Sequence, residues 1–84
     1  EQPTRIDLLF ELGKALENLG DIPEAIPYLI DAENKDKENL DIKVHLAKDF
    51  LALKRYILAE KTLKRILKIE PEHEVAKELL KQCG

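Results

Sequence analysis

The chain has 84 residues, of which 44% are apolar and 37% are charged, with two Phe, two Tyr and no Trp. This length makes one domain, and the composition is too apolar for a disordered chain and too charged for a membrane protein. No apolar run approaches the ~20 residues that span a bilayer, so we expect no membrane insertion. The net charge of −3, with both signs interspersed, argues against nucleic acid as the main partner.

Cysteine content and the chain ends say little about location. Cys83 is the single cysteine, which excludes an internal disulfide and is compatible with a reducing compartment such as the cytoplasm. Because the chain has neither an initiator Met nor a signal peptide, we expect an excised domain or a processed product. The compartment therefore stays open.

The first predicted helix follows Thr4, which we expect to act as its N-cap. Gly13 lies on the apolar side of this helix, and because glycine costs roughly 1 kcal/mol relative to Ala inside a helix, it indicates a close approach by another helix. Gly20 is expected to end the helix in a left-handed conformation. Leucines at helical spacing form the predicted buried stripe, namely Leu9, Leu12, Leu16 and Leu19.

A second helix is predicted to start at once, with Asp21 as its N-cap and Pro23 and Glu24 in its first turn. Pro27 lies inside this helix, and we expect it to bend the helix slightly or to loosen its first turn. The apolar positions expected to be buried are Ile22, Ala25, Ile26, Leu29 and Ile30.

The second half of the chain predicts three more helices. Asn39 caps the third, Lys54-Arg55 forms a turn without glycine, and the fourth helix stops before Pro71. A left-handed lysine costs on the order of 1 kcal/mol, so this turn is either strained or shaped differently. Burial is expected for Ile42, Leu46, Ala47, Phe50 and Leu53 in the third helix, for Tyr56, Ala59, Leu63, Ile66 and Leu67 in the fourth, and for Val75, Ala76, Leu79, Leu80 and Cys83 in a fifth helix over Glu72 to Cys83.

The apolar positions return after 34 residues. Leu12 matches Leu46, Gly13 matches Ala47, and the pairs Leu16 and Phe50, Ala25 and Ala59, and Leu29 and Leu63 follow. This helix–turn–helix period, with Leu-Gly, Gly20-Asp21 and the later Ala, Leu and Ala, resembles the tetratricopeptide repeat (TPR) family. The resemblance implies an all-α fold, an α-solenoid of antiparallel helix hairpins with five helices in one domain over residues 1–84: repeat 1 at 6–39, repeat 2 at 40–73 and a capping helix at 72–84.

The same resemblance implies a concave groove, lined by the first helix of each repeat, that binds a protein or peptide partner. Phe10 and Val44 would offer apolar contact flanked by Lys14 and Lys48, which suits a segment with one hydrophobic anchor and an acidic group nearby. Alternatively, Phe10 packs against an N-terminal neighbour. The groove positions implied by the repeat are Asp7, Phe10, Lys14, Glu17 and Asn18, then Asp41, Val44, Lys48, Leu51 and Ala52, then Val75, Glu78 and Gln82 in the cap.

One specialisation of the family is missing. Repeats that grip acidic chaperone tails carry Lys and Asn in the first unit, Asn in the second and Lys or Arg in the third. The corresponding positions here are Phe10, Lys14, His45, Val75 and Leu79, so binding by that route is not expected. Ile57 and Leu58 lie where the second repeat is usually polar. Either they mark an interface, or a rotated helix start buries one of them.

No motif predicts catalysis. The chain has no Gly-rich phosphate loop, no nucleophile motif and no clustered metal ligands, so we expect no enzyme activity, no metal and no cofactor. His45 and His73 fit surface or helix-end roles, the acidic residues around His73 fit a solvated helix start, and Cys83 fits an inert thiol rather than a regulatory one. We therefore predict a non-catalytic protein–protein interaction module, with a scaffold or oligomerisation element that self-associates through the solenoid ends, or a regulatory module of a larger protein, as alternatives.

Overall fold

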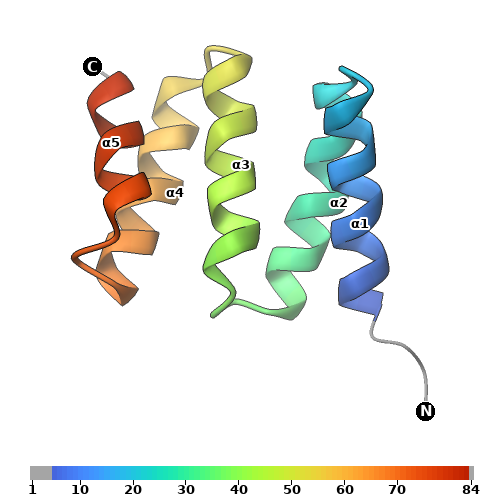
Figure 1. Cartoon of the computed structure of the whole chain (residues 1–84), viewed down its shortest axis with the longest axis horizontal. Helices are drawn as coiled ribbons and strands as arrows, with labels where there is room; N and C mark the ends of the chain where they lie inside the picture. Colours follow the sequence, from blue (N-terminus) through green and yellow to red (C-terminus); the bar gives the residue numbers. More distant parts are fainter. Residues whose placement is uncertain (1–4, 84) are drawn as a thin grey trace.

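Two helical hairpins and a final helix form a single row in the computed structural model, which describes residues 5–83 (Figure 1). Helices α1, α3 and α5 lie side by side in front, and α2 and α4 lie behind them. The predicted all-α solenoid with five helices is confirmed, and no strand occurs in residues 5–83. The helices are α1 (Arg5–Asn18), α2 (Ile22–Lys35), α3 (Leu40–Ala52), α4 (Tyr56–Ile69) and α5 (Glu74–Gln82).

The core runs through the row as two clusters of buried side chains. The first joins the two hairpins, because α2 supplies Leu29 and Ala32 while α3 supplies Ile42, Leu46 and Phe50. The second joins the second hairpin to α5 through Ala47, Leu63, Ile66 and Ala76. Each hairpin therefore buries its apolar face against a neighbour, as in other helical repeats.

The two hairpin turns have the same geometry although their sequences differ. Gly20 has φ +84°, as predicted, and Lys54 has φ +61°, so the strained form of the second turn is the one adopted. In each turn the amide that follows donates back to the preceding helix, from Asp21 to the Leu16 carbonyl at 2.8 Å and from Arg55 to the Phe50 carbonyl at 2.7 Å. Helix packing thus imposes the left-handed turn on a residue that disfavours it.

The predicted N-cap residues Asn39 and Asp21 precede α3 and α2, whereas the start of α5 differs from the prediction. Asn39 caps α3 as predicted, with its side chain accepting from the Ile42 amide at 3.3 Å, whereas Asp21 makes no side-chain cap hydrogen bond. Helix α5 begins at Glu74 rather than Glu72, because the His73 ring accepts from the Ala76 amide at 3.1 Å and caps it. α2 continues through Pro27 as one helix, and the predicted cap at Thr4 lies outside the described residues.

Several apolar residues predicted to be buried are exposed. Leu12 is 43% exposed and Leu19 is 80% exposed, because α1 is the end helix and no described helix covers that side. Leu9 and Leu16 are half-buried. Ile30, Tyr56 and Val75, also predicted to be buried, are exposed as well.

Gly13 marks a close approach, as predicted. A Cβ atom placed on Gly13 would lie 2.7 Å from Cδ2 and 2.9 Å from Cγ of Leu29, a fully buried side chain on α2. The equivalent position in the second hairpin is Ala47, which is itself fully buried. The first hairpin is therefore packed so closely at this point that only glycine fits without a shift in Leu29.

Candidate functional site

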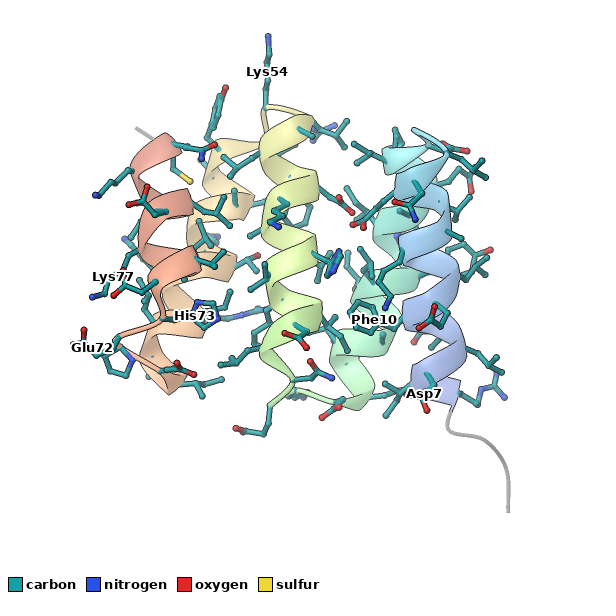
Figure 2. All side chains as sticks on the ribbon, viewed as in Figure 1. Asp7, Phe10, Lys54, Glu72, His73 and Lys77 are labelled. Atoms are coloured by element: carbon teal, nitrogen blue, oxygen red, sulfur yellow. The ribbon has the colours of Figure 1, made fainter. Side chains whose placement is uncertain are left out.

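Helices α1, α3 and α5 lie at the front of the molecule, and α1 and α3 carry the eight residues predicted to bind a partner. We call this side the front face. In Figure 2, Phe10 lies between α1 and α3 and Asp7 lies at the start of α1. Three of the eight partner-binding candidates, Asp7, Asp41 and Lys48, are exposed; the other five, Phe10, Lys14, Glu17, Val44 and Leu51, are half-buried.

Phe10 packs across the space between α1 and α3. Its ring meets the His45 ring edge to face, with 5.3 Å between the ring centroids and 82° between the planes. The Lys14 ammonium lies 4.4 Å from the Phe10 ring centroid, which is cation–π distance, and also pairs with Glu11 at 3.2 Å. The inner contact of Phe10 is thus His45 on α3, and the ring remains partly open on the front face.

Glu17 and Asp49 form an internal acidic pair beside His45. Glu17 Oε1 lies 2.8 Å from His45 Nδ1, while Glu17 Oε2 and Asp49 Oδ2 are buried without another hydrogen-bond partner among the described residues. Burial raises the pKa of Asp49 to about 8, and a hydrogen bond to Glu17 and repulsion from its charge act in the same direction. Protonated Asp49 on α3 can donate a hydrogen bond to Glu17 on α1. Glu17, which the sequence placed in the groove, therefore holds α1 against α3.

A second polar cluster joins the two hairpins at the back. Glu33 on α2 pairs with Lys43 on α3 at 3.2 Å and with Arg65 on α4, and Lys43 also donates to the Lys37 carbonyl at 2.5 Å. Both Glu33 and Lys43 are buried. A cavity of about 440 Å³ beside them is lined by these residues with Asn34, Lys37, Lys68 and Ile69.

Neither polar cluster was predicted, although the sequence held a signal for one of them. Lys43 stands where the first repeat has Leu9, so a cation occupies a position in the buried stripe, and a buried cation requires a partner of opposite charge. His45 and Asp49 gave no such signal, because neither lies in the predicted buried stripe of the third helix, where a polar residue would have indicated a buried partner.

The remaining candidates for chemistry have structural roles. His45 contacts Glu17 and His73 caps α5, and no group of side chains in residues 5–83 could hold a metal ion. Burial and the charge of Glu60 raise the pKa of the Cys83 thiol, which disfavours the reactive thiolate. Across residues 5–83, the helices are too short or too polar to cross a bilayer.

The turn before α4 exposes a second apolar group. Ile57 is 71% exposed and Leu58 is 42% exposed, so the alternative in which a rotated helix start buries one of them does not occur. With Lys54, Arg55 and Tyr56 they line a pocket of about 390 Å³. In Figure 2, Lys54 projects from the tip of this turn.

Stacked antiparallel helix hairpins with a 34-residue period define a helical-repeat protein. The family model of the tetratricopeptide repeat matches residues 16–83, and the chain belongs to this family. Tetratricopeptide repeats generally mediate protein–protein interactions and are generally non-catalytic. A comparison with curated proteins found no match.

Proposed function

We propose that the front face binds a segment of a partner protein across α1 and α3. The observation that carries this proposal is that both repeats have an apolar residue followed four positions later by a lysine: Phe10 and Lys14 on α1, and Val44 and Lys48 on α3. Because the two residues of each pair are four positions apart, they share one side of their helix. Phe10 and Val44 are half-buried, which leaves apolar surface available without a large exposed patch.

The charges around these pairs indicate which segment the face would accept. Lys48 is exposed and forms no ion pair within residues 5–83, so it is free to pair with an acidic group of a partner. Asp7 and Asp41 lie at the starts of α1 and α3, two turns or about 10 Å from the lysines. The front face therefore carries positive charge at one end and negative charge at the other. It suits a segment with an apolar anchor, an acidic end that meets the lysines and a basic end that meets the aspartates.

Glu17 is excluded from direct recognition under this proposal, because His45 and Asp49 already occupy it. It would instead keep α1 and α3 at a constant spacing, so that the face is preformed and the partner alone loses conformational freedom on binding.

Labelled 12-residue peptides would test the proposal by fluorescence anisotropy, with a central Phe or Leu, acidic residues at one end and basic residues at the other. We expect the native chain to bind and the affinity of the double variant Phe10→Glu, Val44→Lys to fall at least tenfold, because a few apolar anchor residues supply most of the binding free energy of an interface. Ile57→Glu is the matched control, since it also replaces an exposed apolar residue but away from the front face.

Equal binding by the front-face variant and the native chain, with unchanged circular dichroism for both, would contradict the proposal. A loss confined to Ile57→Glu would instead move the interaction to the turn before α4. Affinity capture from an extract, with the same variants, would then identify the natural partner.

A specific observation supports a second candidate, a scaffold role in which another domain packs on the turn before α4. Tyr56, Ile57 and Leu58 are all exposed and contiguous there, and contiguous apolar surface of this kind marks interaction sites. This role uses a different surface from the front face, so the two can be tested separately.

A further inference from the structure

The outer side of α1 carries an apolar stripe that faces away from the rest of the molecule. Leu8 is 62% exposed, Leu12 is 43% exposed and Leu19 is 80% exposed, and Ala15 between them is exposed as well. These four residues, which we call the α1 stripe, recur at spacings of three and four and therefore share one side of the helix. Phe10 and Glu17 lie on the opposite side, which contacts α3.

The equivalent stripe in the second repeat is an interface. After 34 residues, Leu8 becomes Ile42 and Leu12 becomes Leu46, and both are buried against the first hairpin as part of the core cluster that joins the hairpins. The α1 stripe thus repeats the apolar side chains of an interface between helices, but no described helix covers it.

The other end of the row does not offer a complementary surface. The outer side of α5 is charged, with Lys77 paired to Glu72 at 2.8 Å and Lys81 paired to Glu78 at 3.5 Å. Figure 2 shows Glu72 and Lys77 at this end of the molecule, away from α1. Head-to-tail stacking of copies would bury these charges against leucines, which is unfavourable because desolvated charges lose their hydration.

The α1 stripe is instead complementary to itself. A two-fold axis that passes beside the α1 stripe, perpendicular to α1 and at the level between residues 13 and 14, places Leu8 opposite Leu19 of a second copy and Leu12 opposite Ala15, so that the large side chain at the centre meets a small one. Glu11 and Asn18 flank the stripe on one side, and the same axis brings Glu11 near Asn18 rather than near another acid. Such an isologous contact closes after two copies.

We propose that the α1 stripe is a homodimer interface in which two copies of α1 pack antiparallel. The partner is a second copy of this chain, and the contact leaves the front face free. Because one 14-residue helix per copy supplies it, the interface falls below the ~1,600 Å² of a standard complex, and the dimer dissociates in the micromolar range.

Sedimentation velocity of the native chain from about 10 µM to about 1 mM spans this range. The mass should rise with concentration from 9.7 kDa towards twice that value. Leu19→Glu should shift the midpoint of dimerisation at least tenfold to higher concentration, whereas Ile57→Glu, at a residue of similar exposure on the turn before α4, should leave it unchanged. Circular dichroism of each variant confirms the fold.

Cysteine cross-linking tests the antiparallel geometry in a Cys83→Ser background. A chain with both Leu8→Cys and Leu19→Cys should form a covalent dimer on mild oxidation, while Leu8→Cys alone should not, since antiparallel packing holds the two copies of residue 8 about 16 Å apart. The proposal is overturned by a chain that stays monomeric throughout, by a dimer that Ile57→Glu rather than Leu19→Glu dissociates, or by efficient cross-linking through Leu8→Cys alone.

Discussion

Asp49 is the residue whose charge state most directly affects the joint between the hairpins. Asp49 is 4% exposed and its carboxyl group lies against Glu17, and the pKa of Asp49 is raised from 3.8 to about 8. The native state therefore keeps a proton on Asp49 at pH values where the unfolded chain has lost it. At neutral pH, Asp49 acts as a neutral hydrogen-bond donor between α1 and α3.

The free energy of unfolding should therefore fall as the pH rises from about 4 to about 8, by up to about 1.4 kcal/mol per pH unit. The sign follows because the native state binds more protons than the unfolded state in this window, and the Asp49 contribution is complete only below pH 4. Asp49→Asn should remove this slope, since an amide donates to Glu17 without titrating. Urea denaturation at several pH values measures the effect.

Asp41→Asn is the matched control for this measurement, because Asp41 is an exposed acid on the same helix. It should leave the slope as in the native chain. His45 also contacts Glu17, so the Asp49→Asn comparison is repeated in a His45→Gln background, which removes this imidazole contact. A slope that persists unchanged in Asp49→Asn would contradict the assigned role of this acid.

At the scale of helices, the contact between α1 and α2 depends on Gly13. Gly13→Ala should destabilise the chain by about 1 kcal/mol, because overpacking against Leu29 costs about 1–3 kcal/mol and the higher helix propensity of Ala returns only about 1 kcal/mol. The measurement is the midpoint of thermal or urea unfolding.

The second hairpin supplies the comparison. Ala47→Gly, at the equivalent position, should also lose about 1 kcal/mol, in this case from lower helix propensity. If Gly13→Ala instead raised the unfolding midpoint, then Leu29 moves aside easily and the close approach does not constrain α1 and α2.

For the whole molecule, the cohesion of the two hairpins depends on charge as well as on apolar contact. Glu33→Gln should destabilise the chain by about 3–5 kcal/mol, because it leaves the buried Lys43 ammonium without a carboxylate. Adding Lys43→Met should restore much of the loss, since the unpaired charge is then gone. Unfolding by urea measures both variants.

Glu38→Gln serves as the control, because Glu38 is an exposed acid in the connector between the hairpins. It should change the stability by less than about 0.5 kcal/mol. A loss in Glu33→Gln that Lys43→Met deepens rather than repairs would show that the cluster stabilises the fold through packing and not through charge.

The sequence predicted the fold well and the candidate site only in outline. Helical spacing and the 34-residue period indicated five helices, and Gly20 and Asn39 indicated where elements end and begin. The period also placed Phe10 and Lys14 on one side of α1. What it could not predict was that Phe10 packs on His45 and that Glu17 is held by Asp49, because these contacts join residues about 30 positions apart.

The sequence by itself determined the repeat architecture, since apolar periodicity and turn residues act locally along the chain. The tertiary structure alone decided which apolar stripe is covered. Leu12 and Leu46 are equivalent in sequence, yet Leu46 is buried against the first hairpin, whereas no helix in residues 5–83 covers the side of α1 that carries Leu12. The tertiary structure also decided the left-handed turn at Lys54 and the proton on Asp49. The physical reason is that burial, and with it the cost of strain or charge, depends on which helices pack together.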